Sequence, residues 1–306
     1  MDSNVNQIIQ KDGYKTALYH YYSETEPKFS IIVLHGMAEH HKRYYPFAKF
    51  LNANGIDVYL YDHRGHGTDK SMKELGFFSN SKGYVKVVDD AIEVIKYVHK
   101  NNRCNKLILM GHSMGSLIAR NVICQYDDLD GTILCGTTHP SKAKIQLGLF
   151  LAGANRFFYG PAHHSNFLNN LLFGSKAYTR LISRTSFDWL SRNNLSVDAY
   201  INDPYCGFVC TSSFYHDLCK LTINASTPSL MKKTRKYLPV FIISGEQDPV
   251  GGYGNEINHL LALYHKWGYN KVEGKLYPEC RHELLQELNA DEVMTDILSW
   301  IQEKCG

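Results

Sequence analysis

The stretch KLILMGHSMG, residues 106–115, decides the fold of this chain. It starts as an apolar run typical of a buried strand and continues as Gly-His-Ser-Met-Gly around Ser113. Residues 116–126 then carry apolar side chains at helical spacing. A strand, a G-x-S-x-G turn and a helix in this order form a nucleophile elbow, whose glycines give the chain room to reverse sharply at the serine. The pattern therefore predicts a catalytic serine at position 113, although a glycine-rich turn in an ordinary β–α unit would give the same pattern.

A serine hydroxyl is a weak nucleophile at neutral pH, so Ser113 needs a base and an acid that orients the base. In folds with this elbow, the acid follows a later strand and the histidine comes after the acid. Residues 238–244 have the composition of such a strand, and the turn after it contains Glu246 and Asp248. Asp248 is the predicted acid because it lies beyond the turn glycine and directly before a proline. Glu246 remains the alternative, and Asp-Pro pairs are also common in plain turns.

Three histidines follow Asp248 in the chain. His259 and His265 fall inside residues 255–267, where the apolar side chains form a helical stripe, so both are expected to face solvent on a helix. His282 instead follows a strand-like segment and a short loop. A histidine on the loop after the last strand can reach the serine, and His282 is therefore the predicted base.

The tetrahedral intermediate of acyl transfer carries a negative oxygen that needs preorganised donors. One predicted donor is the backbone N–H of Met114, the residue after the nucleophile. The other is the backbone N–H of Met37, in the loop that follows the strand-like residues 30–34. Gly36 allows this loop to pass close to the substrate.

The same loop region contains His35, His40 and His41, which raises the question of a metal site. No cysteine or acidic residue close by in the sequence completes a ligand set at metal spacing. We therefore interpret the three side chains as neutral imidazoles packed against the loop, and expect neither a metal nor a cofactor.

Five motifs resemble those of one known family, and they occur in the family's order over most of the chain. They are residues 35–40, 62–67, 111–115, 245–248 and 282–285. Together they are similar to the monoacylglycerol lipase and lysophospholipase branch of the α/β-hydrolases. The resemblance implies a mostly parallel central sheet with helices on both faces and an inserted helical lid. Two positions depart from the family pattern, because Ser116 replaces a frequent second glycine and Asp69 replaces a frequent serine.

The alternation of strand-like and helix-like segments stops between residues 139 and 237, a stretch too long for a loop. We predict a hydrolase core formed by residues 1–138 and 238–306 and a helical lid formed by residues 139–237. The lid residues Phe150, Phe157 and Phe208 are candidates for contacting an acyl chain, although each could equally belong to the lid's own small core.

The composition excludes several other classes of protein. Hydrophobic residues make up 44% of the 306 residues and charged residues 21%, as in globular proteins, and a net charge of +3 is too small to indicate nucleic-acid binding. The eight cysteines lack paired spacing, so free thiols and a cytoplasmic location are expected. No apolar run reaches membrane-spanning length, and the polar residues 1–12 lack the apolar core of a signal peptide. Contact with a membrane surface is expected to be transient at most, and the oligomeric state stays open.

The combined prediction is a serine hydrolase that cleaves carboxylic esters of medium or long acyl chains, such as monoacylglycerols or lysophospholipids. A peptidase, thioesterase or acyltransferase could use the same three residues. A ligand-binding protein without catalysis is the remaining alternative, although such proteins usually lack a member of the triad.

Overall fold

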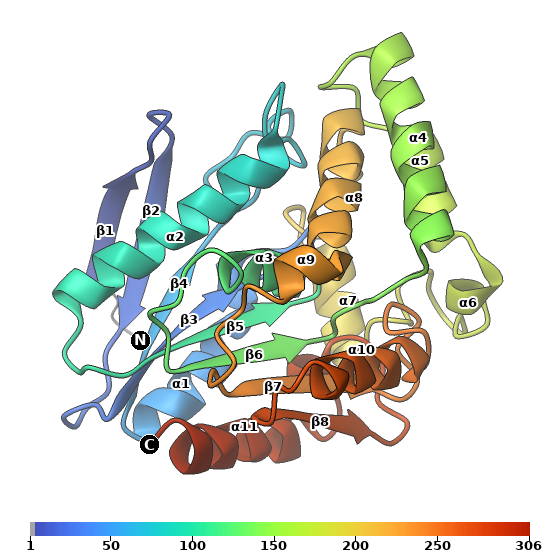
Figure 1. Ribbon diagram of the computed structural model, residues 1–306. Coiled ribbons are helices and arrows are strands. Elements are labelled where there is room, and N and C mark those ends of the chain that lie inside the picture. Colours follow the sequence, from blue (N-terminus) through green and yellow to red (C-terminus); the bar gives the residue numbers. More distant parts are fainter. Residues whose placement is uncertain (1–3) are drawn as a thin grey trace.

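The computed structural model describes residues 4–306, and the first three residues of the polar N-terminal segment lie outside the described part. The described chain contains the strands β1 (Asn4–Ile9), β2 (Lys15–Tyr21), β3 (Phe29–Leu34), β4 (Ile56–Tyr61), β5 (Leu107–His112), β6 (Gly131–Cys135), β7 (Val240–Gly245) and β8 (Val272–Tyr277). They form one sheet in the order β1-β2-β4-β3-β5-β6-β7-β8 (Figure 1). Strand β2 pairs antiparallel with β1 and β4, and all other neighbours are parallel.

Helices cover both faces of this sheet, and each face has its own hydrophobic cluster. One face carries α2 (Gly83–Asn101), α3 (Met114–Val122) and α10 (Asn255–Lys266), and the other carries α1 (Tyr45–Ala53) and α11 (Ala290–Lys304). Short 3-10 turns occupy His41–Tyr44 and Leu284–Gln286. The strands from β3 to β7 are buried along their whole length because both of their faces are covered. These features confirm the predicted fold class.

The segment between β6 and β7 is helical. It contains α4 (Lys142–Tyr159), α5 (Asn166–Phe173), α6 (Lys176–Thr179), α7 (Asn194–Asn202), α8 (Ser212–Ser226) and α9 (Pro228–Met231). Helix α8 packs along α4 and also against α2 and α3, and its Phe214, Leu221 and Ala225 join the core of the sheet domain. The arrowheads of β6 and β8 point toward the side on which α4 to α7 gather (Figure 1). The inserted helices therefore lie at the carboxyl ends of the parallel strands, where active sites of open α/β sheets are found.

Among residues 4–306, no helix combines the length and the apolar character that crossing a membrane requires.

Candidate active site

Ser113 lies at a sharp turn between β5 and α3, with a backbone φ of 51° and ψ of −117°. This left-handed conformation is strained for a residue with a side chain, and the surroundings must hold it in place. The Ser113 N–H donates to the Cys135 carbonyl at 2.9 Å, and its carbonyl accepts from the Ser116 N–H at 2.9 Å and the Ser116 hydroxyl at 2.6 Å. The serine that replaces the family's second glycine thus supports the turn directly.

The two glycines of the elbow have no room for side chains. A Cβ at Gly111 would collide with the Gly115 carbonyl, and a Cβ at Gly115 would collide with the Leu34 carbonyl of β3. This close approach of α3 to the sheet leaves Ser113 partly exposed at the carboxyl edge, while residues 114–122 are buried. The geometry is that of a nucleophile elbow.

His282 and Asp248 form a buried pair on the same edge of the sheet. The His282 Nδ1 and the Asp248 Oδ2 are 2.9 Å apart, and the other Asp248 oxygen accepts from the Val250 N–H at 2.8 Å. Because a carboxylate only accepts hydrogen bonds, Nδ1 carries the proton and Nε2 has its lone pair available. Glu246, the alternative acid, is exposed. The structure therefore brings His282 together with Asp248.

The surroundings of His282 set its protonation. Burial alone lowers the pKa of His282, but the Asp248 carboxylate beside it outweighs burial, so that the pKa lies above its ordinary value. The ring also contacts two other aromatic rings, His112 at 4.8 Å and Trp189 at 5.2 Å between centroids. Burial and the nearby His282 lower the pKa of His112 to about 4, so His112 is a neutral neighbour.

Glycines border the space around these side chains. A Cβ at Gly36 would lie 3.3 Å from the Ser113 Cβ, and a Cβ at Gly136 would lie 3.1 Å from the His282 Cε1. Gly136 also has a positive φ of 59°. Larger residues at either position would intrude between the serine and histidine loops, which explains why both are glycine.

The loop that carries Met37, one of the two predicted oxyanion donors, is fixed by contacts on two sides. Met37 is half-buried, and the next residue, Ala38, has a φ of 52°. The Ala38 N–H donates to His66 Nε2 at 3.2 Å, which fits the neutral state of His66, whose pKa burial lowers to about 3. The Ala38 carbonyl accepts from the Gly207 N–H at 2.9 Å and the Tyr200 hydroxyl at 3.0 Å, both from the inserted helices. The other predicted donor is Met114, the first residue of α3, and its N–H has no acceptor within the helix.

A buried ion network links the two loops that carry the candidate residues. Glu39 accepts from the Gly36 N–H at 2.5 Å, the Tyr44 hydroxyl at 2.9 Å and the Arg43 guanidinium at 2.8 Å. Arg43 also binds both oxygens of Glu283, at 2.5 and 2.7 Å. Burial raises the pKa of Glu39, but Arg43 and its other neighbours outweigh burial and lower it to about 2. Local sequence patterns do not predict this network, although Glu39 and Glu283 lie inside two of the five motifs shared with the family.

The three predicted substrate-contacting phenylalanines lie in two different environments. Phe150 and Phe157 are 70% and 83% exposed on α4. Phe208 is half-buried, with its ring centroid 5.4 Å from that of His66, which binds the oxyanion loop. The structure therefore brings Phe208 close to the predicted site but leaves Phe150 and Phe157 facing solvent.

The other histidines considered in the sequence lie on α10 and in the loop after β3. His259 and His265 are exposed on α10. His35 and His41 are buried, with His35 bonded to the loop backbone and His41 to Asp62 at 2.6 Å. His40 is also buried but contacts Asp203 from the inserted segment, a partner that lies far away in the sequence.

Comparisons with known proteins agree with this arrangement. The profile of the serine aminopeptidase S33 family of hydrolases matches residues 25–289. The human monoglyceride lipase is 30% identical over 297 residues, covering 92% of this chain and 88% of that protein. The monoacylglycerol lipase of Mycolicibacterium smegmatis is 23% identical over 292 residues, covering 91% and 89%. A thermostable carboxyl esterase from Bacillus coagulans has a similar structure, with a TM-score of 0.89, 26% identity and full coverage of both chains. The chain thus belongs to the serine aminopeptidase S33 family of α/β-hydrolases, in the branch that resembles monoacylglycerol lipases.

Proposed function

We propose that this protein hydrolyses carboxylic esters with medium or long acyl chains, of the monoacylglycerol or lysophospholipid type, through Ser113, His282 and Asp248. The general class of enzyme, a carboxylic ester hydrolase, follows from family membership and from relatives that are monoglyceride lipases and esterases. The observation that carries the mechanism is the buried 2.9 Å contact between His282 and Asp248 on the sheet edge that presents the elbow serine.

In the proposed reaction, His282 Nε2 takes the proton of the Ser113 hydroxyl as the oxygen attacks the ester carbonyl. Asp248 keeps the proton on Nδ1 and stabilises the imidazolium that forms. The N–H groups of Met37 and Met114 donate to the negative oxygen of the tetrahedral intermediate. His282 then protonates the leaving alcohol, and water activated by His282 releases the acid from the acyl-enzyme. Each step uses groups of this chain, and no cofactor takes part.

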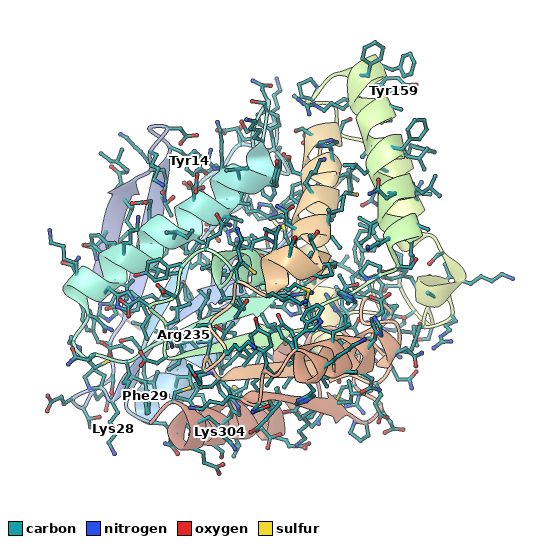
Figure 2. The ribbon with its side chains drawn as sticks, viewed as in Figure 1. Tyr14, Lys28, Phe29, Tyr159, Arg235 and Lys304 are labelled. Carbon is teal, nitrogen blue, oxygen red and sulfur yellow. The ribbon has the colours of Figure 1, made fainter. Side chains whose placement is uncertain are left out.

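The choice of a lipid ester rests on the inserted helices as well as on the relatives. The exposed side chains of α4 include Leu147, Phe150, Phe157 and Phe158, each more than half accessible. Tyr159 lies at the outer end of α4, where its ring stacks on that of His163 (Figure 2). An exposed apolar helix surface on the inserted segment suits an enzyme whose substrates are held in micelles or bilayers, with which it makes transient contact.

Peptidase activity on free N-termini is the main alternative, because the family takes its name from an aminopeptidase. Such an enzyme needs an unpaired acidic group to bind the amine of the substrate. In the inserted segment Asp203 bonds His40, Asp198 bonds Arg184, and Asp217 is buried. These three carboxylates are therefore poorly placed for an amine, which favours ester over peptide cleavage.

The test is a substrate panel measured on the full-length protein. It pairs p-nitrophenyl esters of graded chain length and 1-monoacylglycerols with aminoacyl p-nitroanilides and acyl-CoA thioesters. We expect kcat/KM to rise from acetate to medium-chain esters and to be far lower for the anilides. A preference for aminoacyl anilides or thioesters would replace the proposed substrate class, while loss of all activity on Ser113→Ala would still assign the nucleophile.

A further inference from the structure

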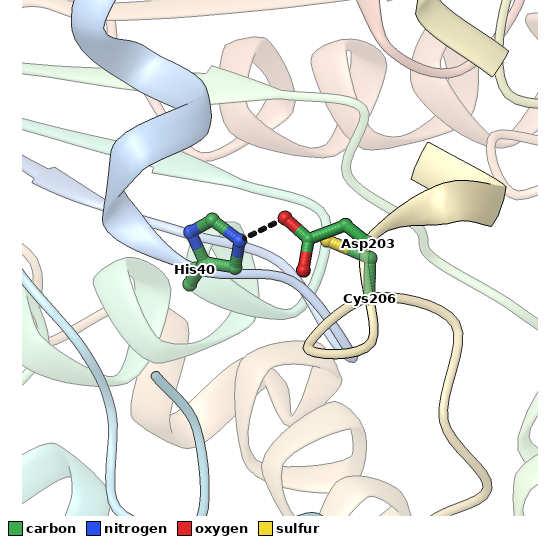
Figure 3. Close-up of side chains that lie close together, drawn as sticks. All are labelled: His40, Asp203 and Cys206. Atoms are coloured by element: carbon green, nitrogen blue, oxygen red, sulfur yellow. Dashed lines mark hydrogen bonds and ion pairs between the residues drawn. The ribbon is translucent and has the colours of Figure 1, made fainter. Parts of the chain in front are cut away.

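Three potential metal ligands converge where the inserted segment meets the loop after β3. They are His40, Asp203 and Cys206, and their ligand atoms all lie within 4.8 Å of one another (Figure 3). His40 comes from the loop after β3, whereas Asp203 and Cys206 come from the turn after α7. We propose that these side chains form a zinc-binding site that ties this turn to the sheet domain.

The chemistry of the three ligands matches zinc. Imidazole nitrogen, carboxylate oxygen and thiolate sulfur are the ligands that Zn²⁺ takes in proteins, and three protein ligands leave one position for water. Zinc–ligand distances of about 2.0–2.3 Å in a tetrahedron put the ligand atoms roughly 3.3–3.8 Å apart. The present arrangement therefore needs only a small contraction around the ion and rotation of the Asp203 carboxylate away from its 2.8 Å contact with His40 Nε2.

The Cys206 thiol is the observation that a simple hydrogen-bonded pair does not explain. Cys206 is only 8% exposed, and within residues 4–306 its sulfur makes no hydrogen bond. The His40 Nε2 and the Asp203 carboxylate already bond one another, whereas among the described residues the buried His40 Nδ1 has no hydrogen-bond partner. A small apolar residue would fill the Cys206 position equally well in a purely structural contact. A buried sulfur directed at an imidazole and a carboxylate is the arrangement of a soft metal site.

The surrounding charges also favour a dication. Arg43, Glu39 and Glu283 all lie close enough to Cys206 to act on it electrostatically. When Zn²⁺ binds, the Cys206 thiol loses its proton to solvent. The charged groups around the ion are then one cation, Arg43, and four anions: Glu39, Glu283, Asp203 and the Cys206 thiolate. This excess of negative charge offsets the charge of the ion without any rearrangement of the Arg43 network.

The position gives the site a structural consequence. Backbone turns already hold Asp203 and Cys206 together, since the Cys206 N–H donates to the Asp203 carbonyl at 3.0 Å. The next residue, Gly207, donates to the Ala38 carbonyl at 2.9 Å, next to the Met37 amide. Zinc at this point would hold the turn against the oxyanion loop and reduce opening of the inserted segment there.

The experiment compares metal binding by the full-length protein with binding by single variants. After treatment with a chelator, Zn²⁺ is titrated in competition with a chromophoric chelator, and Co²⁺ is used as a spectroscopic substitute. The variants are Cys206→Ser, His40→Gln and Asp203→Asn. The matched control for loss of one sulfur is Cys219→Ser, because Cys219 is a half-buried thiol outside the proposed site, on α8.

We expect one equivalent of tightly bound Zn²⁺ in the wild type and in Cys219→Ser, and its loss in the three site variants. The Co²⁺ complex should show a thiolate charge-transfer band in the near ultraviolet that is absent from Cys206→Ser. Zinc should also raise the thermal midpoint by a few degrees and protect the amides of residues 203–210 from hydrogen exchange. Equal zinc stoichiometry in wild type and Cys206→Ser, or a wild-type Co²⁺ complex without the thiolate band, would overturn the proposal. Because the Co²⁺ spectrum is read on the wild type, the test holds even if a variant fails to fold.

Discussion

Two regions on the carboxyl side of the sheet differ sharply in which side chains they expose to water. Around His282 the charged groups are buried and paired: Asp248 is fully buried, and the Glu39, Arg43 and Glu283 side chains are at most 11% exposed. On α4, by contrast, large apolar side chains such as Phe157 stand in solvent. Under the proposed function, the first region would hold fixed charges where the reaction needs them, and the second would offer apolar surface to a substrate assembly. The proposal therefore predicts that chemistry and substrate capture are separated in this molecule.

The largest effect should come from Ser113→Ala. Removal of the nucleophile is expected to lower kcat for ester hydrolysis by about a thousandfold or more, because the oxyanion donors alone supply little rate. The variant should keep its fold, since the hydroxyl of Ser113 is not needed for the backbone bonds of the elbow. Steady-state kinetics with circular dichroism as the folding control checks both parts. Substantial turnover by the purified, folded variant would remove Ser113 from the mechanism.

Asp248→Asn should follow, with a loss of roughly 10²–10⁴ in kcat, because an amide can no longer hold the imidazole in the required tautomer. Glu246→Gln is the matched control at an exposed acid of the same turn and should change kcat by less than about twofold, since surface substitutions away from the site have small effects. The comparison is made with one soluble ester under identical conditions. If Glu246→Gln were the more harmful change, the acid would be misassigned.

Arg43→Met should test the ion network that joins the oxyanion and histidine loops. Without the Arg43 guanidinium, the buried carboxylates of Glu39 and Glu283 have no cation between them, and we expect the free energy of unfolding to fall by about 3–5 kcal/mol. The exposed pair of Arg184 and Asp198 serves as control, and Arg184→Met should cost about 1 kcal/mol or less. Urea denaturation measures both. Equal effects of the two substitutions would mean that the buried network does not stabilise the site.

The pH profile should report the environment of His282. A general base acts only when neutral, so kcat/KM should fall about tenfold per pH unit below the pKa of His282 in the free enzyme. Because Asp248 raises that pKa, the midpoint of the acidic limb should lie above the ordinary histidine value of about 6.5. In Asp248→Asn the residual activity should show a lower midpoint. A wild-type profile that stays flat well below pH 6 would contradict the role of His282.

The smallest effect should come from the exposed face of α4. Phe157→Ser and Phe150→Ser should raise the apparent KM for micellar or vesicle-bound esters severalfold, because less apolar area is available for contact. Turnover of a short soluble ester should remain unchanged. Identical losses on soluble and assembled substrates would place these phenylalanines in the reaction itself.

Local patterns in the sequence were sufficient for the fold class and for the positions of Ser113, Asp248 and His282 on the sheet edge. The elbow, the turn after a strand and the loop after the last strand are each recognisable from a short stretch of consecutive residues. Strand β1 was not predicted because half of its NVNQII sequence is polar, and most of its residues are exposed at the edge of the sheet.

The missed features are contacts between distant parts of the chain. Arg43 meets Glu283 across 240 positions, and His40 meets Asp203 across 163. The histidines of the loop after β3 showed no nearby ligand because the acidic residue and the cysteine arrive from the turn after α7. Likewise, the exposure of Phe150 and Phe157 depends on how α4 rests on α8, which the apolar spacing of α4 alone does not determine.

Activation of Ser113 by His282 is the central step of the proposed reaction, and active-site labelling tests it most directly. The full-length protein is treated with a small fluorophosphonate, and the adduct is located by mass spectrometry of its peptides. We predict one adduct per chain, on Ser113, formed rapidly in the wild type and much more slowly in His282→Ala. An adduct on another residue, or a labelling rate that is the same in wild type and His282→Ala, would contradict the account.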